Sequence, residues 1–151
     1  DIGKTIYMNQ SQLLDLLAND MEIGSHTINH APLALIDPKY LPWEIGSAKK
    51  FLEKKLDGYV LRGKAYPNGG YNKNVINAMQ EYGFVYGLTG KVGANTHQNF
   101  AQTPYEMYRI SIVDDGSGLE GFKRRLERAY IWGYLQTKGI DLNILREILM
   151  K

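Results

Sequence analysis

Two histidines are the strongest candidates for chemistry in this sequence. His26 and His30 stand four positions apart at the end of the stretch MEIGSHTINH, residues 21–30. If the backbone is helical from His26, residues i and i+4 lie on one face, and both imidazoles can reach one metal ion. A third ligand, usually a carboxylate, would complete such a set. The same spacing also occurs on solvated helix faces, so the rest of the chain has to decide between a metal site and a surface.

The hydrophobic pattern predicts an α/β domain with parallel strands and crossover helices. We expect strands at 21–24, 59–66, 84–89 and 105–113, and a polar loop over 90–104. Helices are predicted at 9–19, 43–56, 72–83, 118–136 and 142–150, with Asn9 and Asn72 as N-caps. Such alternation argues for right-handed crossovers. Four strands cannot close a (β/α) barrel, which typically takes ~250 residues.

Polar groups follow the predicted strands at the points where those strands end. The histidine pair follows 21–24, the turn Pro67-Asn68-Gly69-Gly70 follows 59–66, and Asp114-Asp115 follows 105–113. Because α/β folds assemble their sites at the carboxyl ends of strands, we expect a site there.

Composition excludes several classes of protein. A net charge of +2 is too small to argue for nucleic acid, and the one basic cluster, Lys123 to Arg128, reads as a solvated helix face. Without cysteine the chain can form neither disulfides nor thiolate metal sites. No apolar run approaches the ~20 residues of a membrane span. The chain opens at Asp1, and we expect it to be a processed product or one piece of a longer chain.

Three stretches resemble motifs of one enzyme family. EIGSHTINH is similar to a histidine motif, H-[ST]-x-x-H, with its preceding strand. AYPNGGYN is similar to a Tyr-Pro-x-Gly turn, and YGFVYGLTG followed by MYRISIV resembles a later strand pair. In this order and spacing, from about residue 5 to 125, the chain resembles the polysaccharide deacetylases of the NodB-homology type (carbohydrate esterase family 4), especially the branch acting on poly-N-acetylglucosamine-like polymers.

The resemblance implies part of a distorted (β/α)7 barrel, with residues 1–137 as the C-terminal portion of a deacetylase domain and 138–151 as a helix packed on it. It implies metal-dependent removal of N-acetyl groups from a cell-wall or extracellular polysaccharide, and a location outside the bacterial cell or at its surface. His26 and His30 would hold the ion, expected to be zinc, with cobalt or nickel as alternatives. The ion would polarise the acetamide carbonyl and lower the pKa of its bound water. The backbone N–H of Asn68 would face the oxyanion, and four neighbours would line the substrate: Tyr66, Pro67, Gly69 and Tyr71.

The sequence also departs from the family pattern. The motif Thr-Phe-Asp-Asp-Gly, which supplies the catalytic base and a metal-binding aspartate, should lie several tens of residues before His26, where this chain has not yet begun. We therefore expect a missing N-terminal segment, or a second copy, to complete the barrel. The family's arginine before the turn is replaced by Ala65. Arg109 is our candidate to orient the catalytic aspartate in its place, the alternative being an arginine that reaches the barrel rim. The family's Leu-x-His is not visible, and His97, the remaining histidine, lies in a loop that does not match it.

Two alternatives stay open. Asp114-Asp115-Gly116 could mimic the missing Asp-Asp-Gly, or could be ordinary turn chemistry before a helix. The domain could also be a deacetylase-like module that has lost catalysis and binds glycan or serves as a structural element. The sequence upstream of Asp1 would distinguish the two: a Thr-Phe-Asp-Asp-Gly motif there would support the enzyme, and its absence would support the module.

Overall fold

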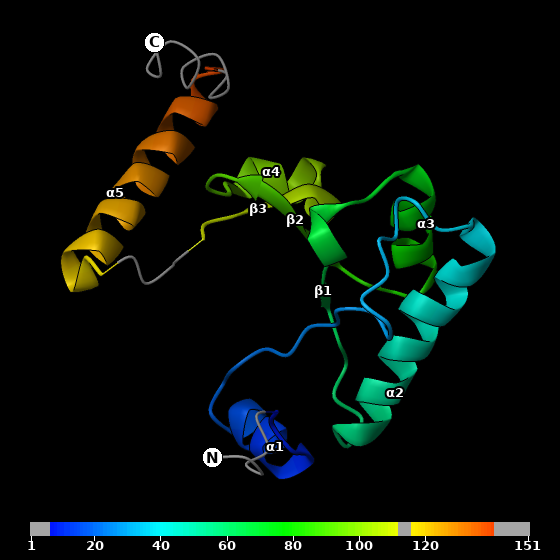
Figure 1. The fold of residues 1–151 in the computed structure, drawn as a ribbon. Helices are drawn as coiled ribbons and strands as arrows, with labels where there is room; N and C mark the ends of the chain where they lie inside the picture. The colour runs from blue at the N-terminus through cyan, green and yellow to red at the C-terminus, as the bar shows by residue number, and fades with distance from the viewer. Residues whose placement is uncertain (1–6, 112–115, 141–151) are drawn as a thin grey trace.

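A parallel sheet forms the centre of the fold. The computed structural model describes residues 7–111 and 116–140 (Figure 1). Within these ranges three strands form one sheet in the order β1-β2-β3, namely β1 (Gly63–Ala65), β2 (Tyr86–Val92) and β3 (Met107–Arg109). Both strand pairs are parallel, and the described strands do not close a barrel. The predicted α/β class with parallel strands is therefore confirmed.

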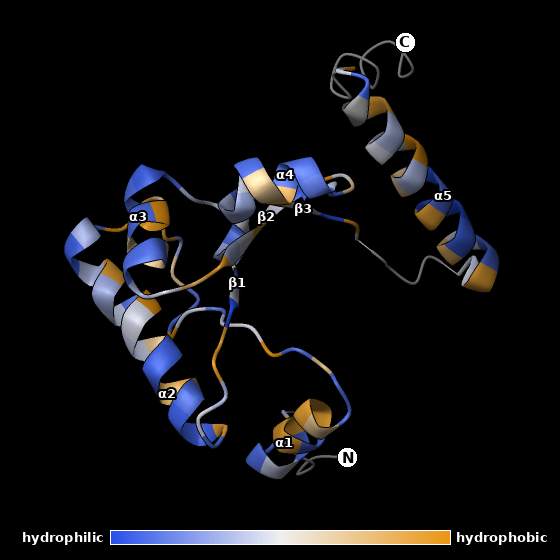
Figure 2. Cartoon of the chain, turned by 180° about the vertical axis from the view of Figure 1, so that it is seen from behind, coloured by the Kyte–Doolittle hydropathy of each residue, from blue (hydrophilic) through white to orange (hydrophobic). Residues whose placement is uncertain are grey.

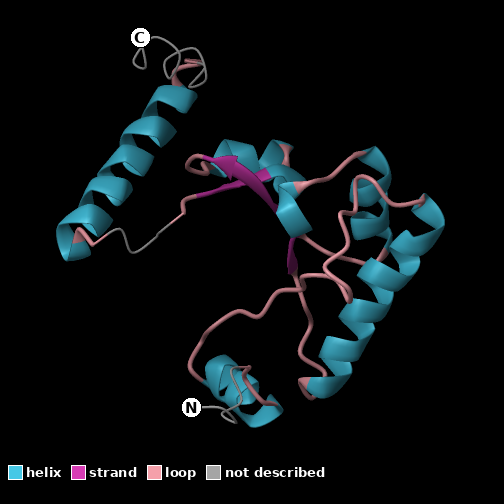
Figure 3. Cartoon of the chain, in the orientation of Figure 1, coloured by secondary structure: helices cyan, strands magenta, loops and turns pink. Residues whose placement is uncertain are grey.

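Helices flank the sheet on both sides. They are α1 (Gln10–Ala18), α2 (Ala48–Lys55), α3 (Lys73–Glu81), α4 (His97–Gln102) and α5 (Gly118–Thr137). Shorter turns are η1 (Pro38–Tyr40), the π-helix η2 (Pro42–Ser47), η3 (Pro67–Gly69) and η4 (Pro104–Glu106). The α3 helix packs against η2, which leads into α2, and α5 lies beyond the opposite end of the sheet (Figures 1 and 3).

Two helix starts form as the sequence predicts, because their caps are local. The side-chain oxygen of Asn9 accepts the N–H of Gln12, and the Gln12 side chain accepts the N–H of Asn9 in return. Asn72 likewise accepts the N–H of Val75 at 3.1 Å, and α3 ends just before Gly83, whose φ is +70°.

The predicted strands are too long at their amino ends. The segment 21–24 is not a strand; only Ser25 pairs with Lys64, in an isolated parallel bridge. The strand predicted over 59–66 is limited to β1, and Val60 is exposed. Apolar residues favour extended structure, but a strand forms only where a neighbour supplies hydrogen-bond partners along its length.

Other boundaries differ as well. The loop predicted over 90–104 contains α4, which begins because Thr96 and Asn99 form a reciprocal cap. The predicted third strand begins later, at Tyr86, and runs on to Val92, and the predicted fourth strand is limited to β3 within the described residues. The helix predicted from residue 43 begins as η2, and Phe51 on α2 is 60% exposed. Asp114-Asp115 and the helix predicted at 142–150 lie outside the described residues.

The hydrophobic core lies between η2, α3 and the sheet. Three of its buried members lie on α3, and the others lie on η2 or in the segments that connect the helices and strands: Leu33, Leu41, Ile45, Leu56, Leu61, Tyr66, Val75, Ala78, Met79 and Phe84. The aliphatic faces of α1 and α5 appear as orange stripes in Figure 2. No helix in the described part of the chain is both long and apolar enough to cross a membrane.

Candidate functional site

The two histidines of the motif lie against each other. The ring centroids of His26 and His30 are 4.9 Å apart, with the ring planes at 70°. The segment between them is not helical, since Thr27 and His30 have φ values of +68° and +54°. The helical route considered for this pair is therefore wrong, and an irregular turn with two strained residues brings the rings together.

A hydrogen bond orients the first imidazole. His26 Nδ1 lies 2.8 Å from the backbone oxygen of Ala65. A carbonyl can only accept, so Nδ1 carries the proton, and in the neutral ring Nε2 keeps the lone pair that a metal ion needs. Metal-binding histidines are commonly oriented in this way.

The histidines and the turn after β1 leave the sheet at the same edge. Ser25 donates its N–H to Gly63 O at 3.0 Å and accepts the N–H of Ala65 at 3.0 Å, which continues the parallel pairing beyond β1. His26 therefore follows one strand-like segment at the level where Tyr66 follows its neighbour. This agrees with the expectation that polar groups gather at the carboxyl ends of parallel strands.

The turn after β1 has an unusual backbone. Asn68 and Gly69 have φ values of +53° and +70°, a conformation that asparagine and glycine tolerate best. A Cβ on Gly69 would lie 2.5 Å from the backbone nitrogen of Gly90, so the turn touches the end of β2 backbone to backbone. The N–H groups of Gly69 and Gly70 bond to Tyr66 and Pro67, whereas the N–H of exposed Asn68 has no partner within the described part of the chain.

The predicted substrate-binding residues divide into two kinds. Tyr66 is 1% exposed and donates its hydroxyl to Tyr105 O at 2.9 Å, and Pro67 is also buried. Because both side chains are buried beneath the turn, the Tyr66 ring has no exposed face that a sugar could contact. Tyr71 is half-buried and stacks on Tyr66 with the ring centroids 5.2 Å apart. Of the two tyrosines, Tyr71 is the one that a sugar could contact.

A network that the sequence did not suggest holds Tyr71. Its hydroxyl lies 2.8 Å from Glu106 Oε2 and 2.7 Å from Lys91 Nζ, and the lysine also reaches Glu106 at 3.4 Å. Burial raises the pKa of Tyr71, and the bond to Tyr71 raises the pKa of Lys91. These residues come from separate elements, so no local pattern could have found the network.

Two further candidates, Arg109 and His97, are both exposed. Arg109 ends β3 and is exposed. It is separated from β1 by β2. His97 is exposed at the first position of α4. Asp114 and Asp115 lie outside the described residues.

The donor set fits a metal ion in part. The imidazoles of His26 and His30 are suitable ligands, but no group of three or more His, Cys, Asp or Glu side chains that could hold a metal ion occurs in residues 7–111 and 116–140. In the same ranges, the hydroxyl of Thr27 is a buried side-chain group without a hydrogen-bond partner. Two imidazoles are fewer than the three protein ligands of a catalytic zinc site, so the described residues alone do not make a complete one.

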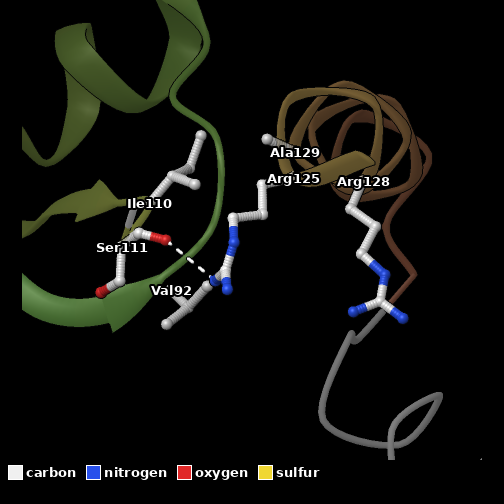
Figure 4. A pocket seen from close by; sticks show the side chains of 6 residues that line it. All are labelled: Val92, Ile110, Ser111, Arg125, Arg128 and Ala129. Atoms are coloured by element: carbon white, nitrogen blue, oxygen red, sulfur yellow. Dashed lines mark hydrogen bonds between the residues drawn. The ribbon is translucent and has the colours of Figure 1, made fainter. Parts of the chain in front are cut away.

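A separate pocket lies between the sheet and α5 (Figure 4). It has a volume of about 180 Å³ and is lined by Val92, Ile110, Ser111, Arg125, Arg128 and Ala129. Arg125 Nη1 donates to the backbone oxygen of Ser111 at 3.3 Å. None of the residues predicted for the site lines it.

Comparison with known proteins defines the class. The family model described as polysaccharide deacetylase matches residues 2–87, more than half of the chain. The YxkH protein of Bacillus subtilis, named as a polysaccharide deacetylase, is 26% identical over 121 residues, which cover 78% of this chain and 42% of the relative. The Streptococcus pyogenes deacetylase PplD, solved in complex with acetate, matches with a TM-score of 0.70 and 23% identity over 85% of this chain and 53% of that one.

A third comparison agrees in fold. BC0361, a polysaccharide deacetylase from Bacillus cereus, matches with a TM-score of 0.66 and 22% identity over 83% of this chain and 38% of its own. The chain thus spans about half or less of the length of these relatives. It belongs to the polysaccharide deacetylase family.

Proposed function

We propose that this chain carries the histidine and oxyanion parts of a metal-dependent polysaccharide N-deacetylase. The observation that carries the proposal is the His26–His30 pair, with ring centroids 4.9 Å apart and His26 Nδ1 bonded to Ala65 O. The substrate class is an N-acetylglucosamine polymer of the cell wall or extracellular matrix, and the protein would act outside the cell or at its surface. In support, PplD was solved with acetate, the product that such a reaction releases.

Each group has a role in this reaction. His26 and His30 would hold a divalent ion, for which we propose zinc. Such an ion supplies Lewis-acid polarisation of the acetamide carbonyl. The N–H of Asn68 would donate to the oxygen that becomes negative in the transition state, and Tyr71 would border the sugar. Hydrolysis breaks the amide C–N bond and yields acetate and a free amine. The base that activates water would come from an aspartate outside these 151 residues.

An acetate-release assay tests the proposal on two proteins, the 151-residue chain and the same chain with its encoded upstream segment. N-acetylglucosamine oligomers serve as substrate, with zinc, cobalt or nickel added. We expect little acetate from the short chain, because loss of a base costs roughly 10²–10⁴-fold in rate. The longer protein should be active, and His26→Ala or His30→Ala should abolish this activity. His97→Ala, an exposed histidine away from the pair, is the matched control and should retain it.

Two results would contradict this assignment. Full activity of the His26→Ala protein would show that His26 does not hold the metal ion. Robust turnover by the short chain that is lost in Asp115→Asn would place the catalytic base at Asp115.

A second candidate is a non-catalytic glycan-binding or structural module, which the two-donor set among the described residues favours. It would release no acetate even with the upstream segment. Oligomer binding by the inactive protein would mark a glycan-binding module.

A further inference from the structure

The loop that carries the two histidines needs an external support. Thr27 and His30 both adopt positive φ, which costs non-glycine residues free energy unless the surroundings fix them. The loop contains no helix or strand hydrogen bonds of its own to do so. Its support comes from a residue fourteen positions beyond His30.

Glu44, on η2, binds this loop with three hydrogen bonds. Its Oε2 accepts the backbone N–H groups of Ile28 at 3.1 Å and Asn29 at 3.0 Å. Its Oε1 accepts the side-chain amide of Asn29 at 2.7 Å. The three donors lie between the two histidines, so the carboxylate fixes the part of the loop that sets the separation of the imidazoles.

The environment of Glu44 keeps it charged. The residue is 5% exposed, and burial acts to raise its pKa. The bonds from Asn29 and Ile28 and the positive charge of Lys64 outweigh burial, so the pKa is lowered. A buried carboxylate that accepts charge-assisted bonds is held in one geometry more firmly than a neutral acceptor.

We propose that Glu44 is a positioning residue for metal binding, whose carboxylate presets the loop so that His26 and His30 face one ion. The idea rests on the proposed metal site and adds to it a residue that does not itself bind the ion. Without the carboxylate the loop would sample other conformations, and each binding event would have to reorder it. Changes to groups that orient metal ligands typically lower metal affinity by about 10–100-fold.

The chain offers a matched control for this residue. Glu53, on the helix that follows η2, also accepts a backbone N–H, that of Leu61 at 3.0 Å, and pairs with Lys49 at 2.8 Å. It does not touch the histidine loop. Glu44→Gln and Glu53→Gln therefore both remove a partly or fully buried carboxylate from the same helical region, and only the first one acts on the loop.

Zinc affinity, measured by competition with a chromophoric chelator on the protein with its encoded flanking sequence, tests the proposal without reference to turnover. We expect Glu44→Gln to weaken zinc binding about 10–100-fold and Glu53→Gln to change it less than about twofold. Circular dichroism of the metal-free proteins, well below their melting temperatures, shows that each is folded. Asn29→Ala removes one of the three bonds and keeps the carboxylate; it should weaken zinc binding by a smaller factor, and it serves if Glu44→Gln does not fold.

Unchanged zinc affinity in the folded Glu44→Gln or, failing that, Asn29→Ala protein would overturn the positioning role, as would equal losses in Glu44→Gln and Glu53→Gln. The proposed metal site is tested separately by His26→Ala and His30→Ala. If those two variants bind zinc as the parent does, the metal site itself is wrong. If they lose zinc while Glu44→Gln does not, only the role of Glu44 fails.

Discussion

Lys64 should give this protein an unusual dependence of stability on alkaline pH. The side chain is 0% exposed in the middle of β1, with Nζ 3.4 Å from Ser25 Oγ and 5.8 Å from the centre of the Phe84 ring. Burial lowers its pKa from an ordinary 10.5 to about 8, and the charge of Glu44 opposes this only in part. At neutral pH the folded protein therefore holds a buried cation, and this lowers its free energy of unfolding.

The sign and size of the effect follow from this pKa. Between about pH 8 and 10.5 the unfolded chain binds a proton at Lys64 that the folded chain has released. The free energy of unfolding therefore rises with pH in this window, and the penalty is fully present below it. One pKa unit corresponds to about 1.4 kcal/mol, so the contribution of Lys64 should grow by roughly 3 kcal/mol across the window.

Urea unfolding of the parent and of Lys64→Met, from roughly pH 7 to pH 10.5, measures the effect. Tyrosines also titrate at alkaline pH, and burial raises the pKa of Tyr86 to about 12. Because both proteins contain the same tyrosines, their contribution cancels in the difference between the two unfolding free energies. This difference should shift by about 3 kcal/mol in favour of the parent as the pH rises. Lys91→Met, at a lysine whose pKa is raised, should show no such rise. A parent-minus-Lys64→Met difference that stays flat would refute the reasoning.

Two further predictions concern packing and association. A Cβ on Gly87 would clash with the hydroxyl oxygen of buried Tyr66, so Gly87→Ala should lower the unfolding free energy by about 1–3 kcal/mol. Gly70→Ala, whose Cβ would meet nothing closer than Ala34 Cβ at 3.7 Å, should not lower it, and equal melting temperatures of the two variants would contradict this prediction. The second prediction concerns α5, on which Leu119 is 66% and Tyr130 79% exposed. We expect the 151-residue chain alone to self-associate, or to need a further segment that covers these side chains and the sheet edges. A compact, cooperatively melting monomer in light scattering would show the opposite.

The sequence predicted features that depend on neighbours along the chain. Asn9 with Gln12, and Asn72 ahead of an apolar helix, are caps whose donors lie three residues away, and both form. The turn at Asn68-Gly69 is similarly local, because both residue types tolerate the positive φ that it requires. The parallel sheet followed from the alternation of elements.

Features that depend on distant partners could not be predicted. The segment 21–24 is as apolar as a strand but pairs only at Ser25, because pairing needs a neighbour. In the sequence Glu44 is one more charged residue at a predicted helix start, and only the fold brings its carboxylate within hydrogen-bond distance of Asn29. Tyr66 and Tyr71 look equivalent on either side of a turn, yet only the fold buries the first.

The π-helix at Pro42–Ser47 is a place where the length of this chain can vary by one residue. A π-helix holds an additional residue compared with an α-helix, so loss of one residue here would let the segment relax to α-helical form. The residues on its two sides would keep nearly the same orientation, because the additional residue had been absorbed within one turn. Loss of Glu44 itself would therefore leave the helix intact and remove all three hydrogen bonds from Glu44 to the histidine loop. An alignment of relatives that opens a one-residue gap here would mark proteins whose histidine loop is held in another way.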